Sequence, residues 1–148
     1  MSTLAYPARF DAEPEGGFSV AFPDFPEGHS QGDTKEEAFE MAIDCLHTVI
    51  EWRLERKVAI PKPSPIRKGQ FSIPVSLDLA PKVALYQVMR DSKMSNLKLA
   101  GKINVSELVV RRMLDPKHRS RPEQYIRALA AFGCTPQVSI VRWDKAKI

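Results

Sequence analysis

Hydrophobic and polar residues alternate at the start of the chain in a pattern typical of short strands. Apolar side chains occupy every second position over residues 4–10 and again over residues 18–22. Residues 13–17 contain a proline and two glycines and separate the two runs, so we predict a β-hairpin. A proline-containing loop over residues 23–28 and a short third strand over residues 29–32 are expected to follow.

A helical period replaces this alternation after residue 33. Thr34 followed three residues later by Glu37 is a capping box, which marks the start of a helix. We expect this helix to run to about residue 55 and to pack on the hairpin through one apolar stripe. The residues predicted to form the stripe are Ala38, Met41, Ala42, Cys45, Val49 and Trp52.

Prolines at positions 61, 63 and 65 end the regular structure. Alternation resumes over residues 71–77 and predicts a strand that returns to the first sheet. The resulting order, β-β-β-α-β, predicts a small α+β domain over residues 1–77. Helical periods dominate residues 78–148, so we predict an all-helical second domain there.

Four short helices are expected in this second domain. Pro81 suits the first turn of the first helix. Ser95 and Ser106 are predicted to cap the next two helices. Asn104 stands between those helices, where a tight turn requires a left-handed residue. This layout is that of a helix-turn-helix, a common DNA-binding module.

The faces of these helices follow from the 3.6-residue period. In the helix-turn-helix, the positions expected to face inward are Leu97, Ala100, Val110 and Leu114. The fourth helix begins at residues 122–123 and ends before Gly133, and its expected inward positions are Ile126, Leu129, Ala130 and Phe132. We interpret residues 136–143, which alternate loosely, as a strand that can pair with a second subunit.

The outward face of the second helix of this pair is suited to DNA. Arg111 and Arg112 point away from the core, and arginine can pair with guanine in the major groove. Leu108 can touch a thymine methyl group, whereas Glu107 can accept from a cytosine amine, orient Arg111 or repel phosphate. With the helix caps and a basic loop suited to phosphates, the predicted DNA-binding residues are Ser95, Asn96, Ser106, Glu107, Leu108, Arg111, Arg112, Lys117, His118 and Arg119.

The charges of the chain divide sharply between its two halves. Residues 1–61 carry 5 Lys/Arg and 12 Asp/Glu, a net charge of −7. Residues 62–148 carry 17 Lys/Arg and 6 Asp/Glu, a net charge of +11. Such asymmetry favours two different partners, and a polyanion suits the basic half.

Segments of both halves together resemble one known family. Residues 24–42, DFPEGHSQGDTKEEAFEMA, are similar to the signature of HicB-type antitoxins. The stretches at 78–86, 95–96 and 110–120 are similar to the subset of that family with a C-terminal helix-turn-helix. The resemblance covers roughly residues 4–133, with its motifs in the same order.

This resemblance implies a fold, a function and two partners. The N-terminal domain would be a partial, non-catalytic ribonuclease-H-like fold that masks a HicA-type toxin. Such a toxin is a small basic protein with a double-stranded-RNA-binding fold that cleaves mRNA with a catalytic histidine. The C-terminal domain would form a homodimer or tetramer and act as a repressor by binding double-stranded operator DNA. Asn104 stands where such motifs commonly have glycine, and the recognition helix carries Glu107 and Leu108, so no operator sequence is implied.

The loop before the long helix contains the residues predicted to face the toxin, Asp24, Phe25, Pro26, Glu27 and His29. An exposed Phe25 beside carboxylates would suit an interface anchor, and the alternative is that it packs beneath the helix. Glu36, Glu37 and Glu40 are interpreted as a solvated helix face. An acidic domain would attract a positively charged toxin and cover its RNA-binding surface.

Other classes of function find less support in the sequence. A metal-dependent nuclease is a remote alternative, because Asp11, Asp24, Asp33 and Asp44 have no spacing that would bring them together, and the histidines are scattered. We expect no catalytic residues, no metal and no cofactor. A ligand-sensing repressor without a toxin partner is the main alternative. We see no signal peptide and no apolar run long enough to cross a membrane, so a cytoplasmic protein is expected.

Overall fold

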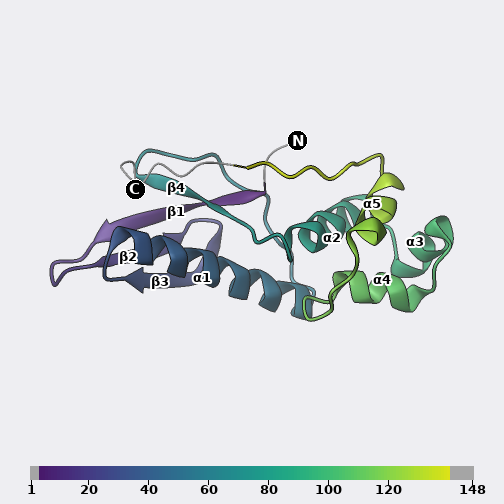
Figure 1. Ribbon diagram of the computed structural model, residues 1–148, viewed down its shortest axis with the longest axis horizontal. Coiled ribbons are helices and arrows are strands. Elements are labelled where there is room, and N and C mark those ends of the chain that lie inside the picture. The colour runs from purple at the N-terminus through teal and green to yellow at the C-terminus, as the bar shows by residue number, and fades with distance from the viewer. Residues whose placement is uncertain (1–3, 141–148) are drawn as a thin grey trace. The chain divides into compact units, whose positions relative to one another are not determined.

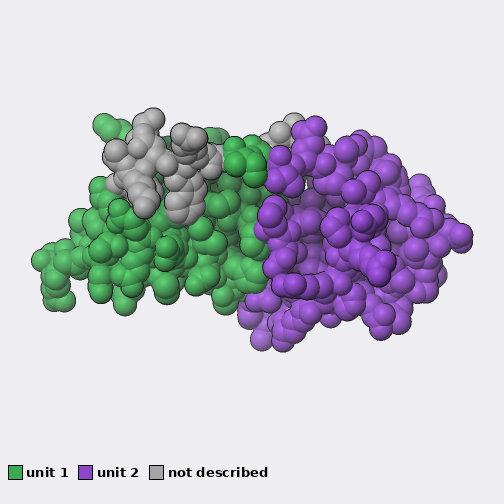
Figure 2. Space-filling view, in the orientation of Figure 1, with its two compact units in different colours: residues 1–50, 61–76, 139–148 green, residues 51–60, 77–138 purple. Residues whose placement is uncertain are grey.

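The structure combines an antiparallel sheet with helices, which confirms the predicted α+β fold class (Figure 1). It is a computed structural model, and it describes residues 4–140. The described chain divides into two compact units (Figure 2). The sheet unit contains residues 4–50, 61–76 and 139–140, and the helical unit contains residues 51–60 and 77–138.

The sheet has four strands, β1 (Ala5–Ala12), β2 (Phe18–Phe22), β3 (Phe25–Gly32) and β4 (Gln70–Pro74), in the order β3-β2-β1-β4. The predicted hairpin and returning strand are confirmed, because β1 pairs antiparallel with β2 on one side and with β4 on the other. Alternation along the strands buries Tyr6 and Ala8 of β1 together with Val20 and Phe22 of β2.

The third strand begins earlier than predicted. Pro23 and Asp24 alone form the turn after β2, and β3 already starts at Phe25. The prediction of a loop over residues 23–28 is therefore wrong. Two prolines and a glycine within six residues are typical of a loop, but Phe25 pairs with Phe22 of β2 and so begins the strand before this stretch ends.

The pairing between β2 and β3 is interrupted at one point. Phe22 pairs with Phe25, whereas its neighbour Ala21 pairs with His29. Residues 26–28 therefore have no counterpart on β2 and form a bulge, which we call the β3 bulge. This bulge breaks the two-residue period, which explains why the alternation of β3 was not visible in the sequence.

The long helix α1 (Lys35–Arg56) starts where the capping box predicts. The Thr34 hydroxyl accepts from Glu37 N at 3.1 Å, and the Glu37 carboxylate accepts from Asp33 N at 2.9 Å. Gly32 lies against this first turn. A Cβ atom at Gly32 would lie 2.6 Å from Ala38 Cα, so a side chain at this position would collide with the backbone of α1.

The buried face of α1 is rotated from the predicted stripe. Ala38, Ala42 and Val49 are buried as predicted, but Met41 and Trp52 are exposed, so their assignment to the core is wrong. Apolar residues occupy two adjoining faces of α1, and periodicity alone does not tell which face is covered. The residues buried in place of the two exposed ones are Phe39, Leu46 and Ile50.

The helical unit contains α2 (Ala80–Ser92), α3 (Asn96–Ile103), α4 (Glu107–Leu114) and α5 (Pro122–Ala130). The predicted caps and turn between α3 and α4 are confirmed. The hydroxyl of Ser95 accepts from Lys98 N at 3.1 Å, and that of Ser106 accepts from Val109 N at 3.4 Å. Asn104 adopts a left-handed conformation with φ of +55°.

Several predicted inward positions of these short helices are wrong. Ala100, Val110 and Leu129 are buried as predicted, whereas Leu97 and Ile126 are exposed. A helix of eight or nine residues makes little more than two turns, so one misplaced apolar residue shifts the predicted face. The residues that form the core instead include Leu99, Ile103, Met113, Tyr125 and Ala128, while Ala130 is exposed and Leu114 and Phe132 are half-buried.

The segment that follows α1 is fastened to α2 within the helical unit. The Tyr86 hydroxyl donates to Val58 O at 3.0 Å, and the Gln87 amide donates to Ile60 O at 3.3 Å. The Ile60 side chain is also buried. These contacts explain why residues 51–60 belong to the helical unit although the chain returns to the sheet unit afterwards.

Residues 134–140 follow the turn after α5 and have no regular secondary structure. The strand predicted over residues 136–143 is thus not formed in its described part, residues 136–140, of this single chain. Residues 141–143 lie outside the described residues. Pairing of this segment with a second subunit stays a prediction.

Candidate binding surfaces

The turn between β2 and β3 is fastened to the proline-rich segment before β4. The Asp24 carboxylate accepts from Ser64 N at 2.9 Å and also from the Ser64 hydroxyl. A small pocket of about 180 Å³ adjoins this contact and includes Pro7 and Gln70 in its lining. Asp24, one of the residues predicted to face a toxin, is therefore half-buried and already engaged within the fold.

Phe25 is not exposed. Its side chain is 0% accessible, and its ring packs edge-on against Tyr6 with ring centroids 4.8 Å apart. Of the two placements considered for Phe25, the exposed anchor is wrong and the buried one is confirmed, because Phe25 belongs to the inward face of β3 rather than to a loop. Its role in the structure is to support the β3 bulge from beneath.

The β3 bulge and the residue after it contain the remaining predicted residues. Pro26, Glu27 and His29 are exposed, and β3 is an outer strand of the sheet. The residue after the bulge also touches α1, because the Cys45 thiol donates to His29 O at 3.5 Å. Burial raises the pKa of the Cys45 thiol, and the negative charge of Glu27 raises that pKa further. This hydrogen bond places the backbone of His29 next to the middle of α1.

An apolar side chain that sequence reasoning placed in the core lies on this part of α1. Met41 is one helical turn before Cys45, so both project from the same side of the helix. Met41 and the nearby Asp44 are exposed, as are Glu36 and Glu40. We use the name bulge surface for Pro26, Glu27, His29, Met41 and Asp44.

The second candidate surface is the exposed face of α4. Val110 and Met113 point into the core, while Leu108, Arg111 and Arg112 are exposed, as the helical period predicted for these three. The Glu107 carboxylate forms an ion pair with Arg111 at 3.2 Å. Of the roles considered for Glu107, this contact favours the orientation of Arg111.

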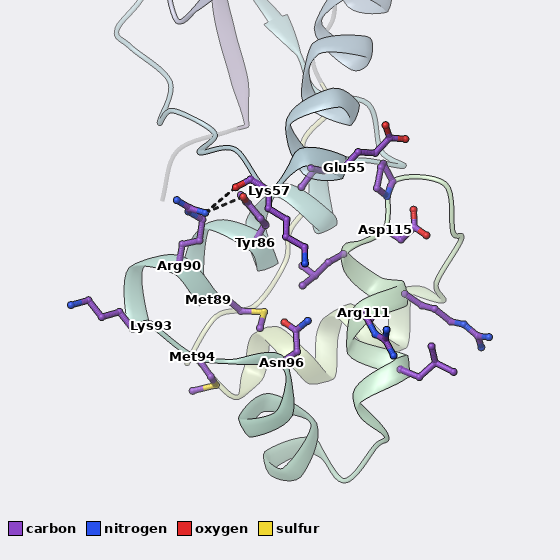
Figure 3. A pocket seen from close by; sticks show the side chains of 15 residues that line it. Glu55, Lys57, Tyr86, Met89, Arg90, Lys93, Met94, Asn96, Arg111 and Asp115 are labelled. Atoms are coloured by element: carbon purple, nitrogen blue, oxygen red, sulfur yellow. Dashed lines mark hydrogen bonds between the residues drawn. The ribbon is translucent and has the colours of Figure 1, made fainter.

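A groove of about 780 Å³ borders the exposed face of α4 within the helical unit. Figure 3 shows Arg90 on α2, which donates to Lys57 O at 3.4 Å and to the Tyr86 hydroxyl at 3.1 Å. Apolar side chains such as Met89 lie deeper in the groove. The charged residues of its lining are mostly cationic and comprise Lys57, Arg90, Lys93, Arg111 and Arg112 against Glu55 and Asp115. An anion would be attracted to a groove with this charge.

The residues after α4 form an ordered loop, residues 115–120, which we call the basic loop. The Asp115 carboxylate accepts from Lys117 N at 2.9 Å and so closes a local turn. The Lys117 ammonium forms an ion pair with Glu55 at 3.2 Å. Lys117 and Arg119 are exposed, whereas His118, the third residue predicted to contact DNA from this loop, is half-buried with its Nδ1 atom 3.3 Å from Ser120 Oγ.

A buried charge in the helical unit was not anticipated from the sequence. Among residues 4–140, Lys82 on α2 is the one charged side chain in the core, and it is 3% exposed. Its ammonium donates to Met113 O at 3.3 Å, to His118 O at 2.6 Å and to the Tyr125 hydroxyl at 2.8 Å. A lysine in the first turn of a helix is usually solvated, so no pattern in the sequence marked Lys82.

Burial shapes the titration of this cluster. It lowers the pKa of Lys82, although the carboxylates of Asp115 and Asp78 partly oppose that effect. Burial also raises the pKa of Tyr125 to about 12, against a smaller opposing effect of its hydrogen bond with Ser120. Lys82 and Tyr125 therefore respond to pH in ways that exposed lysines and tyrosines do not.

The side-chain arrangement of the described residues bears on the metal-dependent alternative. Residues 4–140 contain no group of three or more His, Cys, Asp or Glu side chains arranged to hold a metal ion. Of the four aspartates considered as ligands, Asp24 is instead engaged by Ser64. None of the helices in the described part of the chain is long and apolar enough to cross a membrane.

Comparisons with known proteins find relatives along most of the chain. A family model described as HicB-like antitoxin of bacterial toxin-antitoxin system matches residues 5–84. Antitoxin HicB 1 of Photorhabdus laumondii is 36% identical over 140 residues, which cover 95% of this chain and 89% of that protein. Antitoxin HicB of Escherichia coli K12 is 33% identical over 130 residues, 88% of this chain and 94% of that protein. Antitoxin HicB of Pseudomonas fluorescens is 31% identical over 125 residues, which cover 82% of this chain and 84% of that protein.

Proposed function

The chain belongs to the HicB-like family of antitoxins of bacterial toxin–antitoxin systems, and from this premise we propose that its sheet unit binds and neutralises a small mRNA-cleaving HicA-type toxin. The helical unit, in this proposal, binds operator DNA and represses the operon. The observation that carries the proposal is the family match over residues 5–84, which spans the strands and α1. The opposite net charges of residues 1–61 and 62–148 support two separate partners.

The bulge surface is our candidate for toxin contact. It includes one exposed apolar side chain, Met41, and the exposed carboxylates of Glu27 and Asp44. A toxin that cleaves RNA must present positive charge, so a surface with carboxylates and an apolar side chain complements it in charge and in hydrophobicity. The outer edge of β3 adds backbone groups that can pair with a strand of the partner. Met41 thus takes the anchoring role that we had assigned to Phe25.

Reversing a charge and removing the apolar side chain of the bulge surface test toxin binding. Full-length Glu27→Arg and Met41→Asp variants are co-expressed with the product of the adjacent small open reading frame, and pull-down and growth rescue are scored. We expect each variant to weaken the complex about tenfold or more and the double variant to lose rescue.

Glu15→Arg is the matched control for these variants. Glu15 lies in the turn between β1 and β2, at the opposite end of β2 from the bulge, and it is exposed. An equal loss of binding in Glu15→Arg would mean that net charge, rather than the bulge surface, attracts the toxin. Folded wild-type protein that binds no such partner would overturn the antitoxin role and favour a ligand-sensing repressor.

The exposed face of α4 is our candidate for contacts to bases, with the basic loop as the candidate for contacts to phosphates. Arg111 and Arg112 project from α4, and Lys117 and Arg119 lie beyond its end. The capped first turns of α3 and α4 add backbone N–H groups that favour phosphate. Two half-sites one helical turn apart require at least a homodimer, and a tetramer would fulfil the same condition.

Arg112→Ala tests this DNA-binding proposal. Because a bidentate arginine–guanine contact is worth about 1–3 kcal/mol, we expect operator affinity to fall about 10- to 100-fold, with weaker discrimination against non-operator DNA. The measurement is fluorescence anisotropy at fixed salt with DNA from upstream of the operon, and toxin pull-down should be unchanged.

Arg127→Ala removes the same charge from an exposed position on α5 and serves as the matched control. We expect it to weaken binding only a few-fold, through long-range electrostatics. Equal losses in Arg112→Ala and Arg127→Ala would indicate non-specific attraction to DNA and would contradict a role of α4 in reading the operator.

A further inference from the structure

The end of α4 is held by side chains from two other helices. The last carbonyls of a helix lack intrahelical partners, and Met113 O is one of these in α4. It accepts from the Lys82 ammonium at 3.3 Å and from the Tyr125 hydroxyl at 2.9 Å. Donors from α2 and α5 therefore meet at the point where the chain leaves α4 for the basic loop.

The same ammonium also holds the middle of the basic loop. Lys82 donates to His118 O at 2.6 Å, the shortest of its hydrogen bonds, and its third bond goes to Tyr125 at 2.8 Å. All three N–H groups of the ammonium thus have a partner. In the described part of the chain, no buried side-chain nitrogen or oxygen lacks a hydrogen bond, so this network is complete.

A buried ammonium is an unusual way to hold a loop. Burial of a charge carries a large desolvation penalty, which an apolar side chain of similar length would avoid. Such a side chain would, however, leave Met113 O and His118 O without these donors. The negative end of the α4 dipole at Met113 O partly offsets the penalty of the positive charge.

The hydrogen bond from Lys82 to His118 O fixes the basic loop between its two exposed cations. Its carbonyl lies between the two exposed cations Lys117 and Arg119, so Lys82 holds the loop at the residue that both of them flank. The same ammonium holds the last turn of α4. One buried group therefore sets the basic loop relative to the helix that carries Arg111 and Arg112.

We propose that Lys82, supported by Tyr125, is the positioning residue that sets the phosphate-contacting basic loop in register with the base-reading face of α4. The inference rests on the proposed operator binding by the helical unit. Lys82 itself is buried and touches no DNA in this proposal. It acts through the carbonyls of Met113 and His118, and no sequence motif of the chain assigns it this role.

The test compares full-length Lys82→Met with wild type in two measurements. Methionine keeps the length and the apolar stem of the side chain but removes the donors. Hydrogen exchange of the amides of residues 115–120 should become at least about tenfold faster, while the core amides of α2 and α3 stay protected. Operator affinity should fall about 10- to 100-fold, with the salt slope smaller by about 1, because a phosphate contact is lost.

Two further variants separate positioning from general stability. Lys102→Met removes the same charge from an exposed site on α3, and we expect unchanged exchange in the basic loop and at most a few-fold loss of affinity. Tyr125→Phe removes one donor to Met113 O and one acceptor for Lys82. We expect it to accelerate exchange in the same loop and to weaken operator binding about threefold to tenfold.

Each outcome of these measurements decides something. Unchanged exchange and an unchanged salt slope in folded Lys82→Met would overturn the positioning role. If Lys82→Met does not fold, Tyr125→Phe decides alone, and wild-type exchange together with wild-type affinity in that variant would also overturn it. A wild-type protein that fails to bind the operator would instead overturn the proposed function, whereas the exchange experiment would still report whether Lys82 holds the loop.

Discussion

The two units hold their candidate binding segments by different forces. In the sheet unit, the β3 bulge rests on apolar packing, with Phe25 fully buried against Tyr6. In the helical unit, the basic loop rests on a polar network in which Lys82 bonds to the carbonyls of Met113 and His118. Apolar packing is strong but non-directional, whereas hydrogen bonds to a buried ammonium depend on geometry and protonation.

This difference suits the two proposed partners. A protein partner such as a toxin meets a broad surface, so the bulge surface needs support over an area more than it needs exact bond directions. DNA presents phosphates at fixed spacing, so Lys117 and Arg119 must stand in register with α4. We therefore expect the bulge surface to be sensitive to lost volume and the basic loop to be sensitive to pH.

The largest effect is expected from Phe25→Ala. Removing a fully buried aromatic ring should lower the free energy of unfolding by about 3–5 kcal/mol, measured by urea denaturation. Phe71→Ala is the matched control, because Phe71 on β4 is half-buried and packs edge-on against Phe10, so a smaller loss is expected. Equal losses of stability in Phe25→Ala and Phe71→Ala would contradict a special supporting role of Phe25.

The next effect concerns pH and the helical unit. Because burial raises the pKa of Tyr125 to about 12, the folded protein keeps a proton that the unfolded chain loses near pH 10. The bound proton of Tyr125 therefore contributes roughly 2–3 kcal/mol to the free energy of unfolding. This contribution is fully present below about pH 10 and is lost as the pH rises toward about 12. Lys82 acts in the opposite direction, since its lowered pKa makes stability rise with pH below about 10.4.

Urea denaturation between about pH 8 and about pH 12 measures both contributions. Tyr125→Phe should abolish most of the fall above about pH 10, and Lys82→Met should abolish the rise that precedes it. If the free energy of unfolding depends on pH in the same way in Tyr125→Phe and in wild type, the polar network around Lys82 does not make the helical unit sensitive to pH.

A smaller effect is expected from Gly32→Ala in the sheet unit. The new Cβ atom would lie 2.6 Å from Ala38 Cα and 2.8 Å from Glu37 C, and backbone atoms cannot yield easily. We expect a loss of about 2 kcal/mol in the free energy of unfolding, together with weaker toxin binding if β3 shifts. Gly101→Ala on α3 is the matched control, because nothing lies within 4 Å of its Cβ position. The free energy of unfolding of Gly101→Ala should rise by about 0.5–1 kcal/mol. An equal loss of stability in Gly32→Ala and Gly101→Ala would refute close packing at Gly32 as the cause.

Features with local causes were predictable from the sequence. Each of these features depends on residues within four positions of one another. They are the capping box of Thr34 and Glu37, the caps at Ser95 and Ser106, and the left-handed turn at Asn104. The orientation of α4 was also predictable where one apolar position, Val110, was correctly placed inward, because Arg111 and Arg112 then follow from the helical period.

Features that failed depend on partners far along the chain. The helical period predicted one apolar stripe of α1, but the buried face is rotated from it, so Met41 was placed in the core and the bulge surface lacked its apolar member. The bulge hid the alternation of β3, so Phe25 was placed in a loop and its burial stayed open. The roles predicted for individual residues in toxin and DNA binding stay predictions.

The sequence alone therefore determined where the helices begin, which half of the chain is acidic or basic, and which known family the chain resembles, because these properties reside in short stretches or in composition. Tertiary structure decided which residues face outward from α1 and β3, and it brought Lys82 to Met113, His118 and Tyr125, which are 31, 36 and 43 residues away. The physical reason is that burial and hydrogen bonding are properties of the folded neighbourhood, and a residue acquires them only when distant segments pack around it.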